Sequence, residues 1–212
     1  MSEDWYRNTE WGDHTREAFF SKLKRSRSQR DQYLAIQALT LAPHVPDAAL
    51  ELAAHYFETR TGDFDDNRVR LAQARAYCAA GRLDDAADTY RQAALADAAN
   101  PTFKTNSAVE YARFVVENAL SQRYREVAHW MGDTEAEFLL PREGYLWHGI
   151  KAAVAADAGN SNEARRHAVL ALDYAARKKS SIANHPGLGI VSAQELDTNF
   201  HRQIKDLLGN NT

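Results

Sequence analysis

The stretch from Asn67 to Pro101 constrains the fold most, because its apolar residues recur at helical intervals on both sides of Gly81. After this glycine, apolar side chains follow one another at steps of three and four, which places them on one face of an α-helix. Before it, a run rich in alanine predicts another helix, and glycine tolerates the left-handed backbone that ends a helix. The stretch therefore predicts two antiparallel helices joined at Gly81. The apolar face of the second helix consists of Leu83, Ala86, Ala87, Tyr90, Ala93 and Ala94.

Similar turns are expected elsewhere at nearly regular distances. Gly159 precedes alanines at the same intervals at which Gly81 precedes Ala86, Tyr90 and Ala93. Two more turns are expected at His44 and at Gln122. The four turns lie 37, 41 and 37 residues apart, and helical repeats typically have periods of about 34 to 45 residues. Four helix pairs are therefore expected within residues 29–179.

The two flanks have the patterns of capping elements. Residues 1–28 contain a predicted helix over about 13–27, which follows Gly12 and carries Phe19, Phe20 and Leu23 on one face. In residues 180–209, a loop precedes Ser192 and Glu195, whose spacing predicts a capping box. The helix that follows is expected to end at Gly209 and to cover the last pair. Terminal repeats need such covers because their outer faces have no neighbouring repeat.

The combination of small residues with aromatic ones resembles the tetratricopeptide repeat (TPR), which sets small residues where helices touch. The residues that carry this resemblance are Ala74, Ala86 and Ala93, together with Tyr77 and Tyr90. The resemblance is to TPR-like proteins of an uncharacterised bacterial type, and it covers roughly residues 30–178. It implies a single all-α domain over residues 1–212: a right-handed α-solenoid of about four antiparallel helix pairs with capping helices at both ends.

Proteins with such folds usually bind a peptide or a helix of a partner protein on the surface lined by the first helix of each pair. By this analogy, the chain is expected to be a non-enzymatic protein-interaction module. Arg68 and Arg75 are seven residues apart and therefore share a helix face, where they are suited to a carboxylate-bearing partner or are simply solvated. A further candidate contact lies in the loop that follows the last pair. The candidate partner-binding residues are Gln37, Arg68, Arg75, Asn106, Lys151 and His185.

A basic segment in residues 16–30 suggests an alternative function. Six cations occur within fifteen residues, and their density suits the phosphates of RNA or DNA, an acidic protein partner, or a solvated helix face. The cations are Arg16, Lys22, Lys24, Arg25, Arg27 and Arg30. A third possibility is a self-associating structural subunit, a monomer or homodimer in which exposed tryptophans act as contacts. The tryptophans are Trp5, Trp11, Trp130 and Trp147.

The patterns of enzymes and metalloproteins are missing from the sequence. The eight histidines include no His-x-x-x-His pair, no cysteine cluster has zinc-ligand spacing, and no Gly-x-Ser-x-Gly or glycine-rich phosphate loop occurs. Glu163 and His167 share a helix face, which predicts a solvated pair. We therefore expect no catalytic residue, no metal and no cofactor.

The same sequence predicts a cytoplasmic protein. The net charge is −3, so no overall field favours nucleic acid or an anionic membrane. Cys78 is the only cysteine and is expected in the apolar half of its helix, as in a protein of a reducing compartment. The polar start lacks the basic and apolar regions of a secretory signal, and no stretch approaches the ~20 apolar residues of a membrane span.

Overall fold

The computed structural model describes residues 4–26, 28–99, 106–132 and 138–209, which form helices, turns and loops without any strand. Residues in contact group into two compact units, Met1–Ala108 and Val109–Thr212. Among the described residues, no helix combines the length and apolar character needed to cross a membrane.

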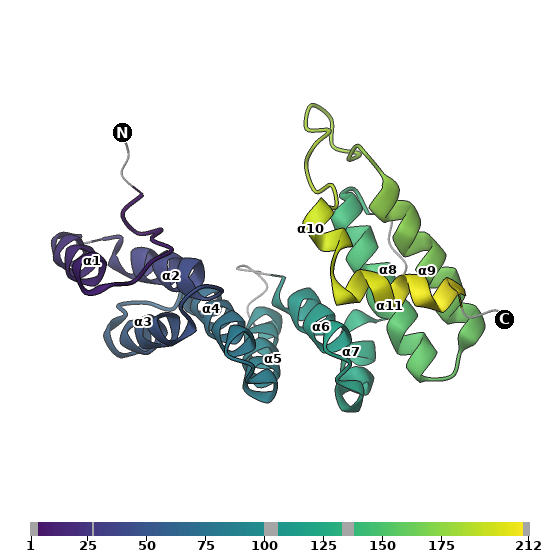
Figure 1. The fold of residues 1–212 in the computed structure, drawn as a ribbon, viewed down its shortest axis with the longest axis horizontal. Helices are drawn as coiled ribbons and strands as arrows, with labels where there is room; N and C mark the ends of the chain where they lie inside the picture. The colour runs from purple at the N-terminus through teal and green to yellow at the C-terminus, as the bar shows by residue number, and fades with distance from the viewer. Residues whose placement is uncertain (1–3, 27, 100–105, 133–137, 210–212) are drawn as a thin grey trace. The chain divides into compact units, whose positions relative to one another are not determined.

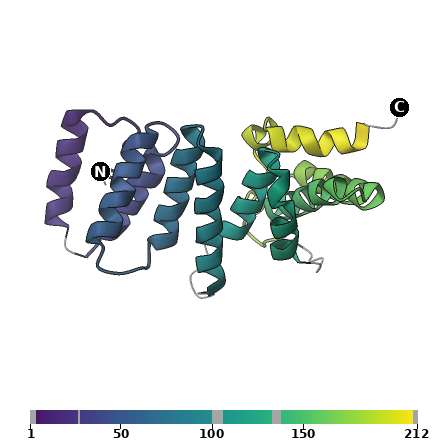
Figure 2. The same ribbon diagram turned by 90° about the horizontal axis from the view of Figure 1, so that it is seen from below.

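The described residues of unit 1 contain five complete helices, of which four form two antiparallel pairs (Figure 1). The second pair, α4 and α5, is joined at Gly81 as expected. In addition, α3 packs against α4, and the two first helices, α2 and α4, contact each other. Figure 2 shows these helices side by side. The helices are α1 (Asp13–Arg25), α2 (Arg30–Leu41), α3 (Pro46–Thr59), α4 (Asp66–Ala79) and α5 (Leu83–Ala99).

The core of unit 1 is built from leucines, alanines and a few aromatic rings. Alanines at the contacts of α2, α3 and α4 are almost completely buried, so the helix backbones approach closely. Near the end of α5, the buried carboxylate of Asp97 accepts hydrogen bonds from Asn67 Nδ2 at 2.6 Å and from the backbone N–H of Ser107 at 3.0 Å. This carboxylate therefore fixes α4, α5 and residue 107 to one another.

The segment before α1 packs into unit 1 as a cluster of aromatic rings. The Trp5 ring lies 5.4 Å from Phe19 and 4.8 Å from Tyr33, and Tyr6 stacks on Tyr33. Phe19 is almost completely buried, as its place on the apolar face of the predicted helix indicated. The helix α1 is thus attached to α2 and α3 by aromatic contacts.

Unit 2 is centred on the α8 and α9 pair, which α11 covers (Figure 1). Two glycines of α8 make close contacts there. A Cβ atom on Gly144 would lie 2.5 Å from Cδ1 of Tyr174, and one on Gly149 would lie 2.5 Å from Cδ1 of Ile204. The last helix, α11, thus packs on both helices of the pair. The helices are α6 (Ser107–Glu117, which begins in unit 1), α7 (Tyr124–Met131), α8 (Pro141–Asp157), α9 (Ser161–Ala176), α10 (Ala193–Leu196) and α11 (Asn199–Gly209).

The capping box before the closing helix is confirmed, but the helix itself is divided. Ser192 and Glu195 exchange both hydrogen bonds of the box. The helix that they start, α10, ends after one turn at Leu196. A new helix then begins, because the Thr198 hydroxyl accepts a hydrogen bond from the backbone N–H of His201 at 3.3 Å and so caps α11.

The turns between paired helices repeat one backbone motif three times. After α4, Gly81 has φ of 74°; its N–H donates to Cys78 and the N–H of Arg82 donates to Tyr77, which is the Schellman arrangement. Gly159 has φ of 78° and the same pair of bonds.

The third copy occurs after α6, but at Ala119, which has φ of 51°. The expected turn at Gln122 is therefore wrong by three residues, and Gln122 lies in the short 3₁₀ turn η1 (Ser121–Arg123) before α7. The expected turn at His44 does fall between α2 and α3. The left-handed positions 81, 119 and 159 are 38 and 40 residues apart.

Candidate functional site

The two arginines proposed for one face of α4 have different environments. Arg68 is half-buried and forms an ion pair with Asp65, with Nη1 2.5 Å from Oδ1. Arg75, two turns further along, is exposed. Burial is the largest influence on Asp65 and raises the pKa of its carboxyl, although the Arg68 charge acts in the opposite direction. Of the two arginines, Arg75 is the one whose environment suits a partner carboxylate.

Gln37 is engaged inside the protein and does not face a partner. Its side chain is fully buried. Its Oε1 accepts hydrogen bonds from the backbone N–H and Nδ2 of Asn8 at 3.0 and 2.9 Å, and its Nε2 donates to the backbone oxygen of Asn8 at 2.7 Å. The amide therefore holds the N-terminal segment on α2, which corrects its expected place on a binding surface.

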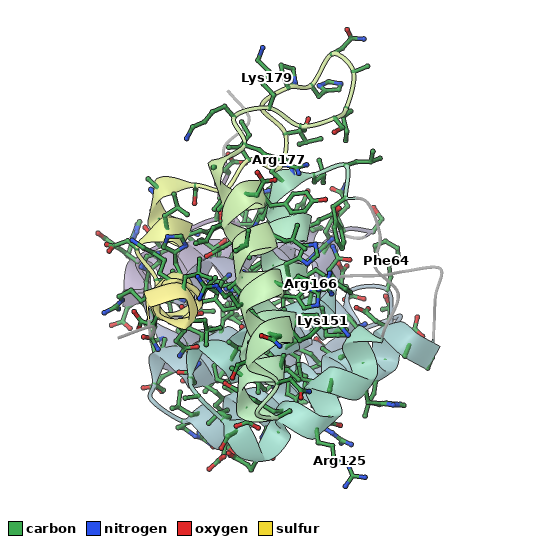
Figure 3. All side chains as sticks on the ribbon, turned by 90° about the vertical axis from the view of Figure 1, so that its right-hand side faces the viewer. Phe64, Arg125, Lys151, Arg166, Arg177 and Lys179 are labelled. Carbon is green, nitrogen blue, oxygen red and sulfur yellow. The ribbon has the colours of Figure 1, made fainter. Side chains whose placement is uncertain are left out.

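The remaining three candidates lie apart from one another along the chain. Asn106 is exposed in a left-handed conformation just before α6 rather than on a helix. Lys151 on α8 donates to the Gly132 carbonyl and lies 5.4 Å from the Trp147 ring centre. His185 is exposed in the loop between α9 and α10, where its backbone carbonyl accepts a hydrogen bond from the Ser180 hydroxyl at 2.7 Å. That loop follows Arg177 and Lys179, which Figure 3 labels at the end of α9.

The basic segment has cations on several sides of α1. Arg16 lies 3.7 Å from Glu51 of α3, and Lys22 lies 5.9 Å from the ring centre of Trp5. Lys24 and Arg25 are exposed. Arg30 begins α2 and its Nη2 is 3.3 Å from Nε2 of His55. Arg27 lies outside the described residues. Among the described cations of the segment, Arg16, Lys24 and Arg25 are exposed, while Lys22 and Arg30 are partly buried.

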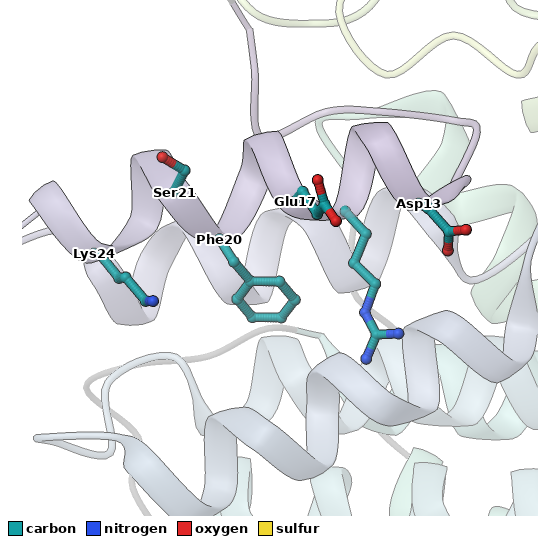
Figure 4. Close-up of a pocket in the computed structure, with 6 residues that line it drawn as sticks. Asp13, Glu17, Phe20, Ser21 and Lys24 are labelled. Atoms are coloured by element: carbon teal, nitrogen blue, oxygen red, sulfur yellow. The ribbon is translucent and has the colours of Figure 1, made fainter.

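An open groove of about 510 Å³ runs along α1 beside these cations (Figure 4). Phe20 forms its apolar part, and the Phe20 ring meets His55 of α3 edge to face, with ring centres 5.6 Å apart. Two acids and two cations share the rim, so the groove has no single sign of charge. The lining residues are Asp13, Arg16, Glu17, Phe20, Ser21 and Lys24.

A smaller cavity of about 310 Å³ lies between the start of α2 and the loop that joins α3 to α4. Oδ2 of Asp31 accepts hydrogen bonds from the N–H and the hydroxyl of Thr61 at 2.8 and 2.9 Å. Phe64, which is 64% exposed, stands at the rim and is labelled in Figure 3. The carboxylate of Asp65 also lines the cavity, so its interior favours a cationic group over an anionic one.

The most unusual group of side chains in unit 2 is a buried histidine pair. Nδ1 of His148 on α8 lies 2.8 Å from Nδ1 of His167 on α9. His148 is 5% exposed and His167 is 2% exposed. His167 Nε2 lies 3.1 Å from Oε1 of Glu163 and 3.0 Å from Nη2 of Arg166. Glu163 is exposed, as predicted for a solvated pair, but the prediction is wrong for His167, which is buried.

Aromatic rings surround this pair. Tyr174 stacks on His148 with ring centres 5.6 Å apart, and Trp147 lies 4.9 Å from His148 and 5.6 Å from His167. The sequence contained no direct sign of the pair, because positions 148 and 167 belong to different helices. The only available signal was their placement: each faces the inside of an α8 and α9 pair that turns at Gly159.

The exposure of Cys78 and of the tryptophans differs from what the sequence predicted. Cys78, expected in the apolar half of its helix, is exposed near the end of α4. The tryptophans are half-buried rather than exposed, and each contacts another ring: Trp5 and Trp11 contact Phe19, Trp130 contacts Tyr111, and Trp147 contacts the histidine pair.

Over the described residues, no group of three or more histidine, cysteine or acidic side chains is arranged to hold a metal ion.

Comparisons with protein-family models, with curated proteins and with solved structures gave no match.

Proposed function

We propose that the chain is a non-enzymatic, TPR-like interaction module that binds a peptide or helix of a partner protein. The observation that supports this proposal most is the contact between α2 and α4. These are the first helices of the two pairs in unit 1, so they form one layer, while α3 and α5 are their second helices. Stacked helix pairs use the layer of first helices as an extended binding surface.

The charge on α4 suggests the chemistry of the partner. Arg75 is exposed, whereas Arg68 on the same face is already paired with Asp65. A carboxylate of the partner that reaches Arg75 would form a charge-assisted hydrogen bond. The proposed partner is therefore a segment with at least one acidic side chain, and Arg75 is the residue of α4 that recognises it.

Affinity purification from the native cell, with wild-type protein and two variants as bait, tests this function. Arg75→Ala is expected to reduce recovery of the partner at least several-fold with unchanged helix content by circular dichroism. Arg91→Ala removes an exposed arginine from α5, the second helix of the same pair, and is expected to recover the partner normally. Equal recovery by both variants, or no specific partner for the wild type, would count against the proposal.

Association with nucleic acid is the second candidate function, and the exposure of Lys24 and Arg25 on α1 favours it. Binding through phosphate contacts weakens steeply with salt, because counterions are released. In a fluorescence anisotropy titration of single- and double-stranded oligonucleotides at low salt, Lys24→Glu combined with Arg25→Glu should weaken binding. A wild-type protein without affinity for any oligonucleotide at low salt eliminates this candidate.

A further inference from the structure

The Nδ1 atoms of His148 and His167 are close enough for one hydrogen bond, and this contact can contain only one hydrogen. A distance of 2.8 Å between two ring nitrogens requires a donor on one side and an acceptor on the other. If both nitrogens carried hydrogens, two N–H groups would point at each other. The number of protons on the pair is therefore limited by the geometry of α8 and α9.

Two proton arrangements of the neutral pair satisfy the neighbours of His167. In one, His167 Nε2 donates to Glu163 at 3.1 Å, so its Nδ1 accepts from His148. In the other, Nε2 accepts from Arg166 at 3.0 Å, so Nδ1 of His167 donates to His148. Either way, one hydrogen lies between the two Nδ1 atoms.

One additional proton fits without loss of the contact, because it can be placed on a nitrogen that does not face the other ring. A second additional proton does not fit. Both rings would then be imidazolium ions, both Nδ1 atoms would carry hydrogens, and two positive charges would be buried side by side. The unfolded chain has no such restriction, since a free histidine accepts its proton near a pKa of about 6.5.

Charged groups from the described residues of α8 and α9 act on the pair in both directions. Glu163 on α9 favours a protonated His167, and the hydrogen bond from Arg166 lowers the pKa of Glu163 so that this carboxyl stays ionised in mild acid. Arg166 on α9 and Lys151 on α8, which lies over the neighbouring Trp147 ring, oppose further positive charge. Figure 3 labels both cations on unit 2. Tyr174 and Phe138 add ring contacts, which disfavour a buried charge.

We propose that His148 and His167 form an acid-sensitive latch that joins α8 to α9 with up to one added proton and releases when both rings become imidazolium ions. Below about pH 6.5, unfolding or opening of unit 2 then takes up at least one proton, because the open state holds two added protons on these rings and the closed state holds at most one. The unfolding constant is expected to rise at least about tenfold for each pH unit of acidification in this range. The latch regulates unit 2 and does not depend on the function proposed above.

Urea unfolding of the full chain between pH 7.5 and 5, followed by circular dichroism, measures this dependence. His148→Gln removes one titrating ring. The rise of the unfolding constant with each pH unit of acidification is expected to be about tenfold smaller in this variant than in the wild type. His201→Gln serves as a comparison, because His201 lies on α11 and contacts Tyr145. Burial and then Lys205 lower the pKa of His201, so its removal is also expected to flatten the profile, by an amount that does not depend on the latch. A control profile with His14→Gln, an exposed histidine of α1, should match the wild type.

The wild type alone provides a second test that does not depend on a variant that folds. With ¹⁵N-labelled histidine, the ring nitrogens of His148 and His167 should show one shared Nδ1 hydrogen at pH 7.5. On acidification, both rings should become imidazolium ions only as the NMR signals of folded unit 2 disappear. Independent protonation of both rings in the folded protein, or equal pH profiles for wild type and His148→Gln, would overturn the latch.

Discussion

Asn8 and Gln37 are joined by three hydrogen bonds, although 29 residues separate them in the chain. The amide of Gln37 is buried; its oxygen accepts two hydrogen bonds from Asn8, and its nitrogen donates one to Asn8. Since the partner atoms include the backbone N–H and carbonyl of Asn8, this amide acts as a clamp for the N-terminal segment. The aromatic contacts of Trp5 and Tyr6 with Tyr33 depend on the segment being in this place.

Gln37→Leu should therefore release the N-terminal segment. Loss of the amide leaves the backbone groups of Asn8 unpaired, which costs about 1–3 kcal/mol when such groups are buried. Trypsin cleavage after Arg7 should become faster, and the free energy of unfolding should fall. Gln32→Leu, an exposed glutamine of the same helix, is the control and should change neither quantity. Cleavage at the wild-type rate in Gln37→Leu would show that the aromatic contacts hold the segment without the amide.

The turn at Ala119 predicts a stabilising substitution. Ala119 has φ of 51°, a conformation that glycine adopts without strain and that costs an alanine about 1–2 kcal/mol. Part of the gain is offset, because glycine makes the unfolded chain more flexible. Ala119→Gly is thus expected to raise the free energy of unfolding by about 0.5–1 kcal/mol, measured by urea denaturation.

Ala158→Gly is the matched control for this substitution. Ala158 lies at the end of α8 with φ of −74°, where alanine fits without strain. Glycine should therefore destabilise the protein there by about 0.4–1 kcal/mol. Opposite signs for the two substitutions support the Schellman turn at Ala119, whereas destabilisation by both would contradict it.

The ion pair between Arg142 and Glu195 should make unit 2 sensitive to strong acid. Burial alone would raise the pKa of Glu195, but the hydrogen bonds from the Ser192 backbone and from Arg142 lower it overall. A carboxyl whose folded pKa is lowered stabilises the protein above its unfolded value, near 4.5, and loses this contribution as the pH falls through the folded pKa.

Arg142→Met is expected to lower the free energy of unfolding by about 1–2 kcal/mol at pH 7, allowing for the partial exposure of the arginine. The difference from wild type should shrink as the pH falls below 4.5 and Glu195 becomes protonated. Arg202→Met, which removes an exposed arginine from α11, serves as the comparison. A difference that stays constant over this range would mean that Arg142 acts through packing and not through its charge.

The sequence was informative where one residue determines a local backbone feature. Gly81 and Gly159 end their helices with positive φ, and Ser192 and Glu195 form the capping box, because each of these features needs only residues close in the chain. Helical periodicity also identified the members of the α2, α3, α4, α5, α8 and α9 pairs. At Ala119 the same reasoning failed, since alanine seldom adopts a left-handed conformation and gave no signal.

Contacts between distant segments were outside the reach of the sequence patterns. Gln37 was placed on a binding surface because polar residues of first helices usually face solvent, yet Asn8 covers it. His167 was predicted to be solvated from its spacing to Glu163, but its partner His148 lies on another helix. Arg75 is exposed, as its place on α4 allowed, because exposure requires no particular neighbour; its role in binding stays a prediction.

The close approaches at Gly144 and Gly149 leave room for hydrogen alone at two positions five residues apart in α8. The side chains that fill this space are Tyr174 of α9 and Phe200 and Ile204 of α11. Any chain that preserves this arrangement must vary at these five positions together, since a larger residue in α8 requires a smaller one opposite. This set of five is thus a signature by which distant relatives of unit 2 can be recognised even after the surface has diverged.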